Sequence, residues 1–140
     1  MGASITVPTV GDRGPTRSVG PLTRTDIVRY AGASGDFNPI HHDDGLAVAA
    51  GFPTVFSIGM LQAGILGAWA TDWLGADHIR HLTTRFREQV WPGDILTFAG
   101  TVVAVEPHPE GGHEIDVELS CTRQTGGVAV SGTASFHIAS

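Results

Sequence analysis

At 140 residues the chain is long enough for one domain that buries a core without disulfides. Its net charge is mildly acidic, −6, and its eight basic residues are all Arg and form no run, so binding to nucleic acid is not expected. The longest apolar stretch, residues 58–70, is too short to cross a bilayer, so we expect no membrane segment. Only 16% of residues are charged, which indicates a surface partly covered by another chain.

The first twenty residues are rich in Gly, Pro and Thr and predict an extended arm with one strand. They lack a charged segment followed by an apolar run, so a secretion signal is not expected. Cys121 is the only cysteine, which excludes an internal disulfide and fits a reducing, cytoplasmic setting.

Two short helices are predicted next. Thr23 and Asp26 have the spacing of a capping box, and the helix that they begin should end within residues 32–35, where two glycines lie. Residues 34–42 contain turn-forming and helix-breaking residues and predict no regular element. A second helix over 43–50 should end at Gly51 and Pro53.

The main helix is predicted over residues 58–74, with Ser57 as its N-cap. It is apolar nearly all round, which predicts burial on every side. Strands follow at 79–91, 95–106, 114–124 and 128–138, and their short connections predict an antiparallel four-strand meander. The sequence therefore predicts a single α+β domain over 1–140, with one long helix packed on an antiparallel sheet.

The segment with the strongest chemical content is residues 34–41, SGDFNPIH. Asp36 and His41 bring a carboxylate and an imidazole to one irregular loop, and together such groups can deliver and remove a proton near neutral pH. From residue chemistry alone the simpler interpretation is favoured, in which Asp36 caps a turn and His41 is merely exposed.

The run GDFNPIH, preceded by Tyr30 and followed by Ala47, resembles the motif of the MaoC-like (R)-specific enoyl-thioester hydratases. The likeness extends from about Pro21 to the end of the chain. It implies a hotdog fold and the addition or removal of water on acyl chains carried by coenzyme A or acyl carrier protein. It also implies a hydro-lyase that needs no redox cofactor and no metal.

The resemblance assigns roles to residues. It makes Asp36 and His41 the acid–base pair, with Asn38 helping to position a side chain or water. It places the thioester carbonyl at the start of the main helix, where the Gly59 N–H would bind it; unpaired N–H groups at a helix start favour a developing oxyanion. The neighbouring Ser57, Ile58 and Met60 are then candidate substrate-binding residues.

One residue departs from the family pattern, which usually reads His-Gly-Met where this chain has Ile58-Gly59-Met60. Two interpretations stay open. Either Ile58 only fills space in the core, or it exchanges polar support for an apolar wall suited to a longer or bulkier acyl group.

Other residues are weaker candidates for a functional site. Residues 41–44 have metal-ligand types, but adjacent residues seldom converge on one ion, so no metal is expected. Trp69 and Trp73 are best explained by packing in the core or at a dimer interface. Three arginines could reach a coenzyme A phosphate, but a solvated strand face explains each of them more simply: Arg85, Arg87 and Arg123. The remaining histidines are best explained as residues of exposed strands or loops: His78, His81, His108, His113 and His137.

The predicted activity is reversible hydration of a 2-enoyl thioester to the (R)-3-hydroxyacyl thioester. Two alternatives remain: a non-catalytic or partner-dependent hotdog subunit of a heteromeric dehydratase, and a hotdog acyl thioesterase. A single sheet over an apolar helix leaves edges and hydrophobic surface unprotected. We therefore expect a homodimer, or a heterodimer with a similar chain.

Overall fold

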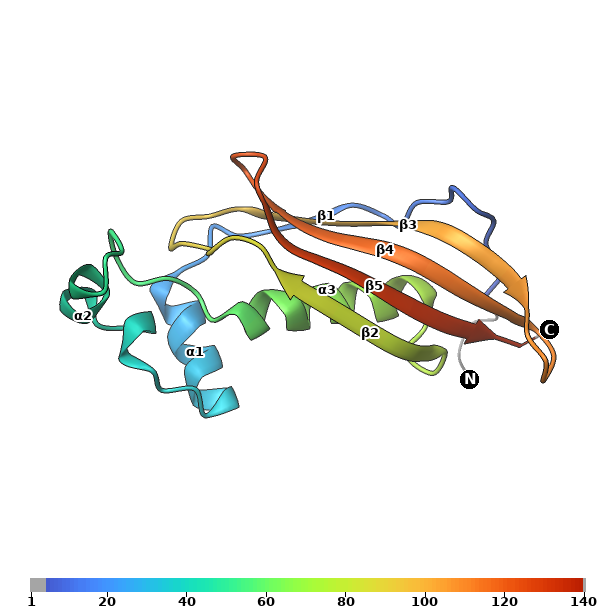
Figure 1. The fold of residues 1–140 in the computed structure, drawn as a ribbon, viewed down its shortest axis with the longest axis horizontal. Helices are drawn as coiled ribbons and strands as arrows, with labels where there is room; N and C mark the ends of the chain where they lie inside the picture. The colour runs from blue at the N-terminus through green and yellow to red at the C-terminus, as the bar shows by residue number, and fades with distance from the viewer. Residues whose placement is uncertain (1–4, 140) are drawn as a thin grey trace.

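The structure, a computed structural model, describes residues 5–139 as a five-stranded sheet packed against one long helix (Figure 1). Two shorter helices lie beyond one end of the sheet. This confirms the predicted α+β class. The helices are α1 (Arg24–Ser34), α2 (Asp44–Ala49) and α3 (Gly59–Leu74), and the strands are β1 (Arg17–Val19), β2 (Ile79–Phe86), β3 (Leu96–Pro107), β4 (His113–Arg123) and β5 (Val128–Ile138).

The strands are all antiparallel, in the order β1-β3-β4-β5-β2. The predicted meander is therefore confirmed for β3, β4 and β5 but wrong for β2, which pairs with β5 at the sheet edge. Turns of a few residues join β3 to β4 and β4 to β5, whereas the long connection after β2 carries the chain across the sheet.

The strand predicted to continue to Trp91 ends at Phe86. The N–H groups of Arg87 and Glu88 both donate to the carbonyl of Ala129, which breaks the regular ladder. Val90 is then fully buried, and its carbonyl accepts a hydrogen bond from the Ser57 N–H at 2.7 Å. The end of β2 is thereby joined to the segment that leads into α3.

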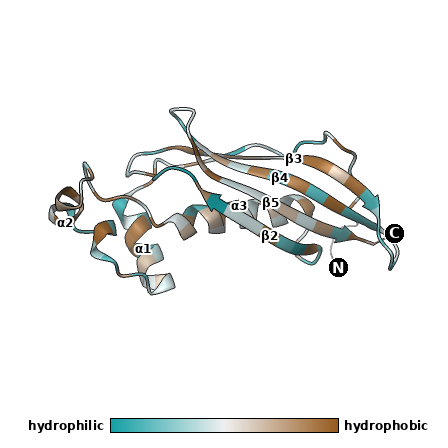
Figure 2. Cartoon of the chain, viewed as in Figure 1, coloured by the Kyte–Doolittle hydropathy of each residue, from teal (hydrophilic) through white to brown (hydrophobic). Residues whose placement is uncertain are grey.

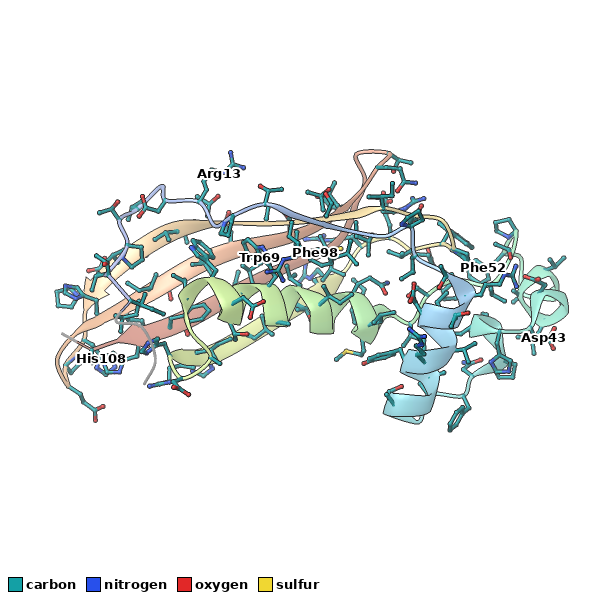
Figure 3. The ribbon with its side chains drawn as sticks, turned by 180° about the vertical axis from the view of Figure 1, so that it is seen from behind. Arg13, Asp43, Phe52, Trp69, Phe98 and His108 are labelled. Carbon is teal, nitrogen blue, oxygen red and sulfur yellow. The ribbon has the colours of Figure 1, made fainter. Side chains whose placement is uncertain are left out.

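The core lies between α3 and the sheet. Figure 2 shows apolar and polar bands alternating along β3 and β4, as expected when one face of a sheet is buried. Trp69 of α3 and Phe98 of β3 are buried in this layer (Figure 3). Over its described residues the N-terminal segment runs beside β3, and the Trp69 indole N–H donates to the Pro15 carbonyl at 2.8 Å.

The helix ends follow local chemistry in α1 but not in α3. The capping box of Thr23 and Asp26 is present, and Gly35 ends α1 with a φ of 75°. Ser57 is not the N-cap of α3, because Ile58 holds that position without a side-chain hydrogen bond. The Ser57 hydroxyl instead donates to Gln62 Oε1 at 2.7 Å, a buried partner that lies inside the helix.

The prediction that the long helix is buried on every side is wrong for this single chain. A stripe of α3 residues spaced four apart is exposed: Met60, Gly64, Ala68 and Asp72. Residues four apart lie on one helical face, so α3 presents a narrow, mostly small-residue surface away from the sheet. Within residues 5–139, no helix is long and apolar enough to cross a membrane.

Candidate active site

The loop after α1 is built by side chains that cap their own backbone. The Asn38 N–H donates to Asp36 Oδ1 at 3.2 Å, and the Ile40 N–H donates to Asn38 Oδ1 at 3.1 Å. Pro39 fixes its own φ, so with the Asn38 cap it begins a 3-10 helix, Pro39–His41. The prediction that residues 34–42 hold no regular element is therefore wrong for these three residues and for Ser34, the last residue of α1.

The loop brings Asp36 and His41 together. The His41 Nε2 and Asp36 Oδ2 atoms are 3.8 Å apart, too far for a direct hydrogen bond. The His41 side chain is 11% exposed and the Asp36 side chain 42% exposed, so solvent reaches the pair mainly from the carboxylate. The arrangement leaves a lone pair on each group for a water or substrate atom between them.

The tautomer of His41 follows from its second nitrogen. His41 Nδ1 lies 2.7 Å from the carbonyl oxygen of Phe56, and a carbonyl can only accept, so Nδ1 carries the proton. In the neutral imidazole Nε2 is then free to accept a proton on the side that faces Asp36. The Phe56 ring meets the imidazole edge-on, with centroids 5.3 Å apart, and fixes its orientation.

An ion pair ties together the segments on both sides of this loop. Arg24 donates to both oxygens of Asp44, at 2.9 and 3.2 Å, and the Thr54 hydroxyl donates to Asp44 Oδ1 at 2.6 Å. The side-chain hydrogen bonds from Arg24, then from Thr54, and the Val55 N–H hold the pKa of Asp44 at about 2. This cluster joins the starts of α1 and α2 to the chain just before Phe56, so it braces the segments on both sides of the loop that carries the pair.

The start of α3 forms one wall of a cavity of about 270 Å³. Gly59 and Gln62 line it from the helix, and Ser57 lines it from the segment just before the helix. The other walls come from the end of β2, the residues after it and β5: Phe86, Arg87, Glu88, Gln89, Ala129 and Val130. Phe56, whose carbonyl holds His41, also lines this cavity. Asp36 and His41 do not line it themselves, so Phe56 is the link between the pair and the cavity.

Gly59 is the first residue of α3, and the first N–H groups of a helix have no carbonyl acceptor within that helix. A Cβ at this position would lie 3.2 Å from the ring of Phe86, which is tighter than ordinary packing. Glycine therefore keeps space between the helix start and the β2 end, where a ligand atom can approach the N–H.

The other predicted substrate-binding residues lie in different surroundings. Ser57 is buried and lines the cavity. Ile58 is 3% exposed and packs in the hydrophobic core, while Met60 is 54% exposed, and neither lines this cavity. Asn38 caps the 3-10 helix. The core position of Ile58 agrees with the packing interpretation, and its role as an acyl wall stays a prediction.

Gln62 was not predicted from the sequence, although it is 2% exposed and lines the cavity with Gly59. The signal available was a single amide within the apolar run of residues 59–70, which is unusual because a buried polar group must find a partner.

The remaining candidates have structural explanations. Arg123 donates to Asp94 and Glu88, so its guanidinium is committed to an internal network. Trp69 is buried in the core with Trp73 packed against it, as predicted. Burial raises the pKa of the Cys121 thiol to about 12. Within residues 5–139, no group of three or more His, Cys, Asp or Glu side chains is arranged to hold a metal ion.

Comparison with known proteins identifies the family of the chain. Residues 7–124 match the family model described as MaoC like domain. The chain belongs to the MaoC-like family. The (R)-specific enoyl-CoA hydratase of Rhodospirillum rubrum is 30% identical over 120 residues, which cover 84% of this chain and 80% of that protein. The family and the hotdog fold implied by the motif are therefore confirmed.

Two mycobacterial comparisons bear on assembly. The 3-oxo-4,17-pregnadiene-20-carboxyl-CoA hydratase beta subunit of Mycobacterium tuberculosis is 35% identical over 82 residues, which cover 58% of this chain and 64% of that protein. A chain in the crystal structure of the ChsH1-ChsH2 complex from Mycobacterium tuberculosis superposes with a TM-score of 0.81 and 28% identity. That superposition covers 94% of this chain and 99% of the other.

Proposed function

We propose that the protein hydrates 2-enoyl thioesters of coenzyme A or acyl carrier protein reversibly, giving (R)-3-hydroxyacyl thioesters, with Asp36 and His41 as the acid–base pair. The observation that carries the proposal is the fixed tautomer of His41, whose free Nε2 faces the Asp36 carboxylate at 3.8 Å. Membership of a family with named hydratases supports the reaction class.

The proposed chemistry follows from these atoms. His41 Nε2 takes one proton from a water molecule held between the pair, and the water oxygen bonds to C3 of the enoyl group. Negative charge develops on the thioester oxygen, where the Gly59 N–H stabilises it. His41 then returns its proton to C2, and the Asp36 carboxylate accepts a hydrogen bond from the water and stabilises the imidazolium. The reverse sequence dehydrates the 3-hydroxyacyl thioester.

Substitution of the pair tests this proposal. Asp36→Asn and His41→Ala should each lower turnover at least about 100-fold on crotonyl-CoA, because the first removes the carboxylate that orients the water and stabilises the imidazolium, and the second removes the group that transfers the proton. His42→Ala is the matched control, since His42 is the next residue, is exposed and belongs to no part of the proposed chemistry. Unchanged turnover in Asp36→Asn or His41→Ala, with normal thermal melts, contradicts the assignment.

A second candidate function is that of one subunit of a heteromeric hydratase. The similarity to a chain of the ChsH1-ChsH2 complex and to a protein named a beta subunit favours it. Phe37, next to Asp36, is 65% exposed, Met60, next to Gly59, is 54% exposed, and Phe86 of the cavity wall is 54% exposed. Exposed apolar side chains of this kind are suited to contact with a second hotdog chain.

One assay separates the candidates. Purified protein is mixed with crotonyl-CoA while the enoyl absorbance and the release of free thiol are followed together. Loss of enoyl absorbance without thiol supports a hydratase, and thiol release identifies the thioesterase alternative. No reaction from the chain alone, with activity restored by a second hotdog chain, supports the heteromeric subunit.

A further inference from the structure

Gln62 is a buried amide in the first turns of α3. Its side chain is among the few polar ones in the buried set, and it is 2% exposed in a helix that is otherwise apolar on its buried face. Burial of an amide is unfavourable unless its hydrogen bonds are made, so both ends of the group need partners.

One end of the amide has its partner. The Ser57 hydroxyl donates to Gln62 Oε1 at 2.7 Å, and both residues are buried. The orientation is fixed because the opposite one, with the amide nitrogen toward Ser57, would leave the hydroxyl proton without an acceptor. The Gln62 Nε2 group therefore points away from Ser57.

The other end of the amide, Nε2, has no acceptor among residues 5–139. Nε2 is nevertheless not one of the fully buried atoms without a hydrogen-bond partner in that range, so some of its surface is accessible. Gln62 lines the same cavity as Gly59, so its Nε2 group reaches into this cavity. The amide thus presents two N–H groups to a cavity that the start of the helix also lines, along with the polar side chains of Arg87 and Gln89.

Helix geometry brings the two donors close together. Gln62 lies three residues after Gly59, and residues three apart share a helical face. Long side chains on a helix lean toward its N-terminus and cover the preceding turn. The contact of Gln62 with Ser57, two residues before Gly59, shows this lean directly. The amide N–H and the Gly59 N–H therefore face one region of the cavity.

We propose that Gln62 is a second hydrogen-bond donor to the thioester oxygen, acting together with the Gly59 N–H, and that Ser57 holds its amide in the donating orientation. This rests on the proposed hydration reaction. The charge that develops on the thioester oxygen gives a fixed donor more effect in the transition state than in the bound substrate. Gln62 is then a catalytic residue, and Ser57 a positioning residue.

Gln62→Met tests the donor directly, since Met is of similar length and fits an apolar helix. We expect kcat/KM for crotonyl-CoA to fall about 100- to 1,000-fold, the range found when one oxyanion donor is lost. Ser57→Ala should lower kcat/KM less, because the amide remains but is free to rotate. Ser135→Ala, which removes another buried serine far along the sequence, is the matched control and should leave kcat/KM unchanged.

A spectroscopic measurement separates donation from packing. Isotope-edited infrared spectra of bound butyryl-CoA labelled at its carbonyl should show a higher C=O stretching frequency in Gln62→Met than in the unsubstituted chain. The thioether analogue, which has a CH₂ group in place of the carbonyl, should bind both proteins equally.

Three outcomes overturn the proposal: an unchanged carbonyl frequency, a kcat/KM within twofold of the unsubstituted chain, or equal losses of kcat/KM and thioether affinity. The spectra require no turnover, so an unsubstituted chain that binds butyryl-CoA but hydrates nothing refutes the proposed function while Gln62 is still tested. Failure to bind butyryl-CoA at all overturns both.

Discussion

The stability of the cavity wall depends on one buried carboxylate, that of Asp94, which is 4% exposed. It accepts hydrogen bonds from the Trp91 N–H at 2.8 Å, from Arg123 Nε at 2.8 Å and from Gln124 Nε2 at 2.7 Å. These bonds anchor the connection between β2 and β3, which carries Glu88 and Gln89 of the cavity wall, to the end of β4.

Asp94→Asn keeps the size of the side chain but turns one oxygen into an NH₂ group that faces other donors. The charge-assisted bonds to Arg123 are lost, and a largely buried guanidinium is left without its full partner. We expect the free energy of unfolding to fall by about 2–4 kcal/mol. For a chain of this length that is a decrease in Tm of about 10 °C.

Urea denaturation at pH 7 and fixed protein concentration measures this change. Asp72→Asn is the matched control: Asp72 pairs with Arg17 at 3.1 Å, but the two side chains are 63% and 49% exposed. Such a surface pair contributes about 0–1 kcal/mol. If Asp94→Asn unfolds at the same urea concentration as Asp72→Asn, the assigned importance of the buried network is wrong.

The pH dependence has a definite sign. Burial raises the pKa of Asp94, but the hydrogen bonds from Arg123, Gln124 and the Trp91 N–H outweigh it and hold the pKa below its ordinary value. A lowered pKa stabilises the fold above the unfolded-state value of about 3.9, and this stabilisation is lost as pH falls through the folded-state pKa. The stability difference between the unsubstituted chain and Asp94→Asn should therefore shrink below pH 4.

Three further predictions concern the site and its assembly. Gly59→Ala should lower kcat/KM about 10-fold or more, because the added Cβ would lie 3.2 Å from the Phe86 ring and narrow the approach of the thioester oxygen to the Gly59 N–H. Gly32→Ala, whose added Cβ meets nothing within 4 Å, should leave kcat/KM unchanged. Asp44→Asn should lower kcat while leaving KM nearly unchanged, because it loosens the ion pair with Arg24 that fixes the His41 segment. Asp44→Glu should restore part of the loss, and equal kcat in the unsubstituted chain and both variants would contradict the positioning role of Asp44. Light scattering at micromolar concentration should give a dimer, alone or with a similar chain, since the exposed β2 edge and the α3 stripe need cover, and a clean monomer in both cases would refute this.

The sequence alone determined those features that depend on neighbouring residues. The capping box of Thr23 and Asp26, the end of α1 at Gly35 and the strand periods of β3 to β5 need only local spacing and backbone preference. The Asp–His motif was likewise visible, because its turn-forming residues lie within one short segment. Its family was recognisable from the same few residues.

Only the tertiary structure decided what depends on distant partners. β2 pairs with β5, which lies about fifty positions further along the chain, and the connection after β2 is held by the Asp94 network, which joins residues about thirty positions apart. Ser57 serves Gln62 instead of capping α3, and Ile58 packs in the core, because a side chain's direction depends on what surrounds it. Spacing along the chain fixes which face a residue occupies, but burial and hydrogen-bond partners arise only when the faces meet.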